Sequence, residues 1–310
     1  MPLDLQPTEY FFYIFTKRTQ TTMKFMIKKQ TLRSFWYSLT SNQRFIVRKL
    51  YYYPIDLYDR LTGNYHKYVP PRGYIYTGSP ASYNDYLKQG EQQLGLLKSE
   101  IDLHPNDSVL DIGSGIGRTA IALTSYLNES ASYEGFDVVK LGVKWCNSKI
   151  KKDFQNFNFK YIPLFNDLYN EANLKASEFN FPYKMNNFDK VFSFSVFTHM
   201  QIDEIQNYFS EIHKVLKPNG IAFSTFFLYD DSAEDFIGTN KQFNFTIKNE
   251  GYSLMNNKVK SANIAIHKDK LNAMLEIENL TLIKIIDGFW KGSKDNKIEY
   301  QDIVIFKKKG

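Results

Sequence analysis

The sequence contains a single cysteine, Cys146, among its 310 residues. One cysteine excludes an intrachain disulfide framework and is typical of a reducing compartment. No apolar run approaches the roughly 20 residues that cross a bilayer. No basic stretch precedes an apolar one at the amino terminus, so a secretory signal is not expected. We therefore expect a soluble, cytoplasmic protein in which Cys146 is a buried apolar residue.

Metal and nucleotide-triphosphate motifs are also missing. The five histidines are scattered without an H-x-x-x-H pair, so we expect no metal site. The sequence has no G-x-x-x-x-G-K-[ST] motif, which disfavours a nucleotide triphosphatase. With 43% hydrophobic and 23% charged residues, the composition is that of a globular protein.

The net charge of +6 is concentrated near the amino terminus. Residues 10–55 hold nine basic residues and no acidic one, which leaves 30 basic against 33 acidic residues elsewhere. Aromatic residues alternate with these cations, a mixture that suits an anionic membrane surface, RNA or an acidic partner. The alternative is a helical appendage whose apolar face packs on the main domain while its Lys and Arg remain solvated. We call residues 1–69 the amino-terminal extension and expect residues 70–310 to form the main domain, with a linker at 69–73.

Strands and helices are expected to alternate through the main domain. The helix expected at 203–216 has the clearest apolar periodicity, and 218–220 should stop it. Alternation of this kind is typical of a doubly wound, mostly parallel sheet covered on both faces. The other expected helices are 82–98, 118–127, 141–150 and 268–277, and the expected strands are 108–112, 133–136, 160–164, 188–196, 221–228, 282–286 and 303–307.

The segment Val109–Arg118 joins a strand, a glycine-rich turn and a helix. Its glycines allow a tight turn and the close approach of a ligand to the backbone, and the helix amino terminus faces that ligand. The dinucleotide fingerprint G-x-G-x-x-G is not met, because Arg118 occupies the third glycine position. Asp137 ends the next strand, where a carboxylate can accept hydrogen bonds from both hydroxyls of a ribose. The alternative for Asp137 is a helix cap.

Four blocks in this order and spacing resemble class I S-adenosylmethionine-dependent methyltransferases. The resemblance implies a Rossmann-like sheet of seven strands and S-adenosylmethionine as the cofactor. The blocks are Val109–Arg118, Tyr133–Asp137, Phe181–Tyr183 leading into Phe188–Met200, and Glu211–Gly220.

The resemblance also implies roles for individual residues. The glycine-rich loop would line the methionine and ribose parts of the cofactor. Asp137 would bind the ribose hydroxyls, and Val138 would flank the adenine. Asn166 or Asp167 would reach the adenine amino group, and Ser195 and Val196 would form the floor beside the transferable methyl. Tyr74, Tyr76, Gly78 and Gly90 precede the loop, where this superfamily folds a lid; hinge packing is the alternative. The implied loop residues are Asp111, Gly113, Ser114, Gly115 and Gly117.

His199 follows the fourth strand, on the side of the sheet where ligands bind. A histidine there can accept a proton near neutral pH, and the alternative is that it positions substrate or is structural. The resemblance implies that the segments 229–235 and 243–245 shape the acceptor pocket.

The leading hypothesis is methyl transfer, mainly to oxygen, on a small molecule, a glycan or a secondary metabolite. One alternative is an RNA methyltransferase that uses the basic extension, which could also bind a membrane peripherally. Another is a non-catalytic protein that binds the cofactor or a partner. The [DN]-P-P-[YFW] motif of amino-directed DNA enzymes is missing after the fourth strand, so DNA is not expected as a substrate.

Overall fold

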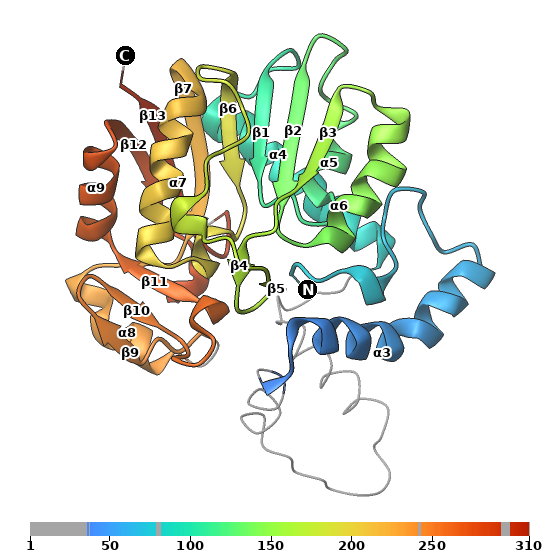
Figure 1. Ribbon diagram of the computed structural model, residues 1–310, viewed down its shortest axis with the longest axis horizontal. Coiled ribbons are helices and arrows are strands. Elements are labelled where there is room, and N and C mark those ends of the chain that lie inside the picture. Colours follow the sequence, from blue (N-terminus) through green and yellow to red (C-terminus); the bar gives the residue numbers. More distant parts are fainter. Residues whose placement is uncertain (1–35, 37, 79–81, 241–242, 293–297, 310) are drawn as a thin grey trace, which may run out of the picture.

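The computed structural model describes residues 36, 38–78, 82–240, 243–292 and 298–309. These residues form a central sheet with helices on both faces, a smaller second sheet beside it, and an amino-terminal helix near the edge of the central sheet (Figure 1). No helix in the described part of the chain is long and apolar enough to span a membrane.

The central sheet has seven strands in the order β12-β13-β7-β6-β1-β2-β3. The five strands from β7 to β3 pair in parallel, and β13 pairs antiparallel with both β7 and β12. The sequence prediction of a doubly wound, mostly parallel sheet is therefore confirmed. The strands are β1 (Ser108–Ile112), β2 (Ser132–Asp137), β3 (Phe157–Tyr161), β6 (Phe188–Ser193), β7 (Leu216–Phe226), β12 (Leu280–Ile286) and β13 (Asp302–Lys308).

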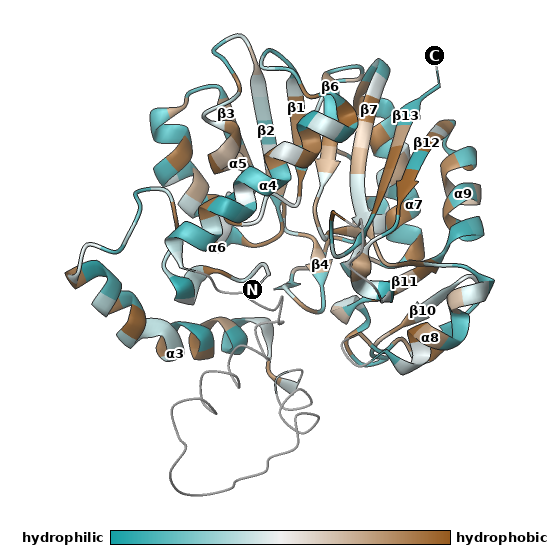
Figure 2. Cartoon of the chain, turned by 180° about the vertical axis from the view of Figure 1, so that it is seen from behind, coloured by the Kyte–Doolittle hydropathy of each residue, from teal (hydrophilic) through white to brown (hydrophobic). Residues whose placement is uncertain are grey.

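Helices cover both faces of this sheet and bury a separate apolar cluster on each. Helices α7 (Ile202–Val215) and α9 (Lys268–Ile277) contribute to the cluster that contains Phe209 and Leu271. Helices α4 (Tyr83–Ile101), α5 (Arg118–Leu123) and α6 (Lys140–Cys146) contribute to the cluster on the other face, the one turned toward the viewer in Figure 2. Cys146 lies buried in that second cluster, as expected.

The third strand differs from the expectation by three residues. It covers Phe157–Tyr161 instead of 160–164 and pairs Phe157 with Tyr133 and Phe159 with Gly135. Both phenylalanines are buried, so their alternation fixes the register of the strand. Pro163 has no amide hydrogen for a ladder bond, and the chain leaves the sheet before it.

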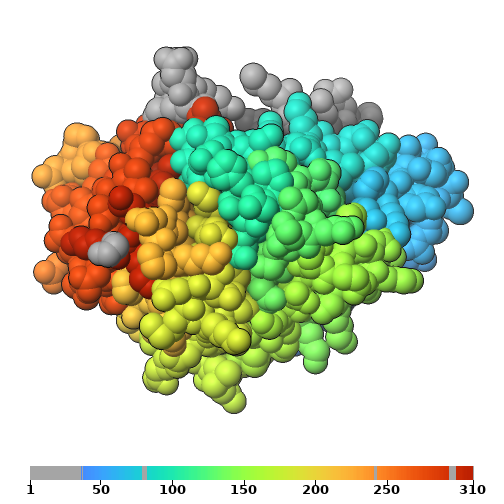
Figure 3. Space-filling model, turned by 90° about the horizontal axis from the view of Figure 1, so that it is seen from above, coloured from blue at the N-terminus to red at the C-terminus, as the bar shows by residue number. Residues whose placement is uncertain are grey.

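Residues 228–267 form a second sheet that the sequence did not predict. Its order is β8-β11-β10-β9, and its aromatic core contains Phe227, Phe243, Phe245 and Trp290. In Figure 3 this orange region and the blue amino-terminal helix lie at opposite ends of the molecule. The elements are β8 (Leu228–Tyr229), α8 (Glu234–Thr239), β9 (Ile247–Asn249), β10 (Tyr252–Leu254) and β11 (Ile264–His267).

Shorter elements connect these parts. Strands β4 (Phe165–Asn166) and β5 (Asn170–Glu171) form a hairpin near the ends of the parallel strands. The single-turn helices are η1 (Arg72–Tyr74), η2 (Asn147–Lys151), η3 (Ala176–Glu178), η4 (Phe197–His199), η5 (Asp231–Ala233), η6 (Lys260–Ala262) and η7 (Phe289–Lys291).

Helix α3 (Ser41–Leu61) is the main described element of the amino-terminal extension. Thr40 caps it through the amide of Gln43. Arg44 and Arg48 are buried in it, so the expectation that the basic residues of this segment remain solvated is wrong for these two. Large apolar side chains are instead exposed along the helix, namely Ile46, Leu50, Tyr53, Leu57, Tyr58 and Leu61. Six of the nine basic residues counted above, Lys17, Arg18, Lys24, Lys28, Lys29 and Arg33, lie outside the described residues.

Candidate functional site

The glycine-rich loop after β1 is held against the end of β2. The amides of Gly113 and Ser114 both donate to the carbonyl of Phe136, at 2.9 and 3.0 Å. Gly113 has φ +72°, and a Cβ there would lie 2.4 Å from a methyl of Val196. Only glycine satisfies both the left-handed backbone and this close approach, so the loop brings the ends of β1, β2 and β6 together.

Asp137 ends β2 and connects the loop to the next helix. Its Oδ2 accepts from the amide of Gly115 at 2.8 Å. Its Oδ1 accepts from the amide of Val139 at 2.7 Å and from the Tyr76 hydroxyl at 3.2 Å. Burial raises the pKa of Asp137 to about 6, although these hydrogen bonds act to lower it. At neutral pH the group is therefore mostly a carboxylate.

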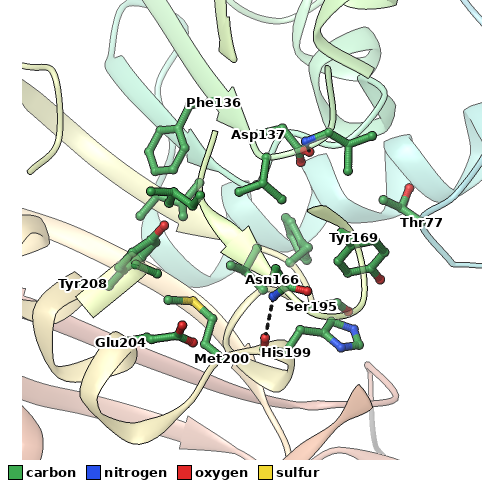
Figure 4. A pocket seen from close by; sticks show the side chains of 18 of the residues that line it. Thr77, Phe136, Asp137, Asn166, Tyr169, Ser195, His199, Met200, Glu204 and Tyr208 are labelled. Carbon is green, nitrogen blue, oxygen red and sulfur yellow. Dashed lines mark hydrogen bonds between the residues drawn. The ribbon is translucent and has the colours of Figure 1, made fainter. Parts of the chain in front are cut away.

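A cavity, here called the first cavity, lies at the carboxyl ends of the parallel strands (Figure 4). About 840 Å³ of space not filled by atoms lies within it, part of which is open to solvent. The structure brings seven of the sequence-predicted site residues together in its lining: Gly113, Asp137, Val138, Asn166, Ser195, Val196 and His199.

Five other predicted site residues do not line this cavity. Gly115 contributes its amide to Asp137. Gly117 is the N-cap of α5 and packs against Ile150 and Cys146. The Ser114 hydroxyl is buried and has no hydrogen-bond partner among the described residues.

Two of those five residues are acidic, Asp111 and Asp167. Asp111 is buried behind the loop, where its Oδ2 accepts from the Tyr133 hydroxyl at 2.6 Å. Asp167 accepts from the amides of Lys260 and Ser261, at 2.7 and 3.0 Å. Of the two residues considered after the third strand, the structure therefore brings Asn166, and not Asp167, into the cavity.

His199 ends η4, the turn after β6, and its ring is fixed in one orientation. Its Nδ1 lies 2.8 Å from the carbonyl oxygen of Ser261. A carbonyl can only accept, so Nδ1 carries the hydrogen and Nε2 has a free lone pair in the neutral ring. Burial lowers the pKa of His199. The neutral form, which can accept a proton, is therefore favoured at neutral pH.

Three cavity residues that the sequence reasoning missed come from η4 and α7. Met200, Glu204 and Tyr208 line the first cavity (Figure 4). Burial raises the pKa of Glu204 to about 7, and its Oε2 accepts from the amide of Gln201 at 2.7 Å. The Gln201–Glu204 spacing is that of a capping box, which could have predicted the start of the helix but not the cavity.

A second cavity adjoins the first and is covered by the amino-terminal extension. Both cavities include Tyr76, Gly78, Tyr169, Ser195 and His199 in their linings. Tyr76 and Gly78 therefore lie where the two cavities meet, and their role as a lid stays a prediction. The extension contributes Trp36, Ser41, Arg44, Phe45 and Arg48 to the second cavity.

The segments 229–235 and 243–245 do not shape this cavity. Tyr229 and the two phenylalanines at 243 and 245 pack in the core of the second sheet instead. From the region after β7, the second cavity takes Ala262 and Asn263, at the end of η6. The aromatic side chains of those segments therefore close an apolar core that is separate from both cavities, and their expected role in an acceptor pocket stays a prediction.

The buried Asp111 predicts a pH-dependent stability. Burial raises the pKa of Asp111 to about 7 from its usual 3.8, so between these values the folded protein holds a proton that the unfolded chain releases. Stability therefore falls as pH rises through this window. Asp111→Asn cannot ionise and keeps an acceptor for Tyr133, so its Tm should exceed that of the wild type. The difference should grow from pH 5 to pH 7 and then level off, at about 3 °C or more.

Thermal unfolding of the cofactor-free protein at pH 5, 6, 7 and 8 checks this prediction. Asp235→Asn, at an exposed position on α8, controls for the loss of one negative charge. A Tm difference for Asp111→Asn that is the same at pH 5 and pH 8 would contradict it.

Comparisons with known proteins agree with this architecture. A family model described as a methyltransferase domain matches residues 103–279. The chain is similar to phosphoethanolamine N-methyltransferase from Plasmodium falciparum (isolate 3D7), with 26% identity over 233 residues that cover 67% of this chain and 80% of that protein.

Solved structures of similar proteins include two methyltransferases. One is the 1,6-didemethyltoxoflavin-N1-methyltransferase of Burkholderia thailandensis with bound 1,6-didemethyltoxoflavin and S-adenosylhomocysteine (TM-score 0.48, 15% identity, covering 83% of this chain and 89% of that chain). The other is an S-adenosylmethionine-dependent methyltransferase from Methanosarcina mazei (TM-score 0.46, 18% identity, covering 67% and 94%).

Proposed function

Since this chain belongs to the class I S-adenosylmethionine-dependent methyltransferases, we propose that it methylates a small molecule held in the second cavity. The observation that carries this proposal is the shared wall of the two cavities. Ser195 and His199 line both, so a ligand in one cavity can meet a ligand in the other beside these residues. Methyl transfer needs that direct approach, because the two reacting centres must be aligned.

The residues of the first cavity fit S-adenosylmethionine. Gly113 lines the cavity without a side chain, so a ligand can approach its backbone closely. Asp137 presents a buried carboxylate at the rim of the loop, which would accept the ribose hydroxyls. Val138 would flank the adenine, and Asn166 would contact its amino group. Ser195 and Val196 would form the floor beside the methyl group.

The cofactor supplies an electrophilic methyl group on a positively charged sulfur, and the chain's own residues would do the rest. His199 would accept the acceptor's proton at Nε2 while Nδ1 remains bound to the Ser261 carbonyl. A base at this position serves a hydroxyl, as the sequence analysis favoured, and equally an amine, since both lose a proton on methylation. The similarity to a protein named phosphoethanolamine N-methyltransferase supports including amines.

An acceptor screen that measures S-adenosylhomocysteine release tests this proposal. The panel should contain small amines such as phosphoethanolamine, phenols, sugars and a structured RNA, each with the wild type and with Asp137→Ala as the control. We expect turnover with at least one small molecule and none with RNA. Turnover with RNA alone would contradict the proposal. Cofactor binding without release for any acceptor would favour the non-catalytic alternative.

A further inference from the structure

Helix α3 has an unusual distribution of side chains. Arg44 and Arg48 are only 7% and 8% exposed, whereas Leu50 and Leu61 are 71% and 77% exposed. Positions four residues apart share one face of a helix, so the two arginines point together into the second cavity, whose lining includes both. Burying two cations while exposing apolar residues is costly, which suggests that these arginines have a role other than packing.

Arg44 is anchored by backbone carbonyls. Its Nε donates to the carbonyl of Trp36 at 3.1 Å and its Nη1 to the carbonyl of Leu168 at 2.8 Å. These bonds connect α3 to the loop after β4, on the rim of the second cavity. They hold the guanidinium in place at this rim.

Arg48 has no such anchor. Within the described part of the chain, no carboxylate forms an ion pair with it, and its guanidinium carbon lies 5.8 Å from the centre of the Trp36 ring. Burial and the neighbouring Arg44 together lower the pKa of Arg48 to about 10, although Tyr169, Tyr52 and Tyr76 act to raise it. The group is still a cation at physiological pH. A buried cation without a counter-charge is destabilising by itself and is compensated when an anion binds.

The surroundings of Arg48 suit an oxyanion. The hydroxyl-bearing rings of Tyr76 and Tyr169 line the same cavity, and both contribute to the electrostatic environment of the guanidinium. A guanidinium offers paired N–H donors in the planar geometry that carboxylates and phosphates accept. The second cavity is also lined by Ser195 and His199, which it shares with the first cavity.

We propose that Arg48, together with Arg44, binds an anionic group of the methyl acceptor, either a phosphate monoester or a carboxylate. This inference rests on the proposed function, because it takes the second cavity as the acceptor site. Binding of the anion orients the acceptor. The oxyanion lies at α3, and the atom to be methylated lies at the wall formed by Ser195 and His199. The extension thereby contributes to substrate recognition through two of its eleven basic residues.

Thermal unfolding and calorimetry with two probe anions test this proposal. The full-length protein is saturated with S-adenosylhomocysteine, and inorganic phosphate or acetate is added at constant ionic strength. We expect at least one anion to raise the Tm of the wild type. Arg48→Met should weaken binding of that anion at least about tenfold, because a charge-assisted bidentate contact is lost. Stronger binding of phosphate would indicate a phosphate monoester on the acceptor, and stronger binding of acetate would indicate a carboxylate.

Two further variants make the result specific. Arg60→Met removes an exposed arginine from the last turn of the same helix and should bind the anion as the wild type does. Arg48→Lys keeps the charge but loses the paired donors, so it should bind with intermediate affinity; it also serves if Arg48→Met does not fold. The affinity for S-adenosylhomocysteine should be unchanged in all three.

The proposal is overturned if neither anion raises the Tm of the wild type, or if Arg48→Met responds as the wild type does. Loss of S-adenosylhomocysteine binding in the wild type would instead contradict the cofactor assignment. The failure of this inference and the failure of the proposed function are therefore distinguishable.

Discussion

Asp137→Ala is expected to raise the Kd for S-adenosylmethionine about 100-fold. The carboxylate would accept two ribose hydroxyls, and each hydrogen bond to a charged group contributes about 1.5–3 kcal/mol. The substitution also leaves the amides of Gly115 and Val139 without their acceptor, so the glycine-rich loop loses a restraint. Calorimetry on the purified variant measures the affinity, and its Tm establishes that it is folded.

Asp235→Ala is the matched control for this measurement. Asp235 is exposed on α8, and its side chain is not part of either cavity. The control should bind the cofactor as the wild type does. An Asp137→Ala protein that is folded and binds within about threefold of the wild type would refute the ribose assignment and leave Asp137 as a helix cap.

The second large effect is expected from His199→Asn. The asparagine amide can still donate to the Ser261 carbonyl, so the position of η4 should be kept while Nε2 is removed. Loss of a general base reduces the rate about 100- to 10,000-fold. We expect kcat to fall within that range while the affinity for S-adenosylhomocysteine stays unchanged, once the acceptor screen has identified a substrate.

The pH profile separates a base from a positioning residue. Because burial lowers the pKa of His199, the wild-type rate should decline only below pH 6.5, where the ring becomes protonated. The decline should disappear in His199→Asn. A variant that keeps most of its kcat and the same acidic decline would show that His199 only positions the acceptor.

The parts of the fold that the sequence predicted best are governed by local interactions. The strand, glycine turn and helix around Gly113 require a left-handed backbone that glycine provides, and Asp137 ends the neighbouring strand at the same edge of the sheet. These features are encoded within short segments, so their positions could be predicted together. The helix expected at 203–216 was predicted for the same reason, because its apolar residues repeat every three to four positions.

The parts that were not predicted depend on contacts between distant segments. Arg48 looks like a solvated residue of a basic helix in the sequence, but α3 places it in a cavity that it shares with Tyr76 and Tyr169 of the main domain. Glu204 looks like a helix cap, and its place in the cavity depends on the path of η4. The sequence does not separate Asp167 from Asn166, because the amides that bind Asp167 belong to Lys260 and Ser261, more than 90 residues away.

A crystal structure with bound S-adenosylhomocysteine is the most direct test of the central claim that the first cavity holds the cofactor and the second holds the acceptor. We predict that the nucleoside hydroxyls contact Asp137 and that the sulfur faces the wall formed by Ser195 and His199. The second cavity should stay open toward Arg48. A cofactor product bound elsewhere, or one that fills the second cavity and leaves Asp137 without a ligand contact, would contradict the account.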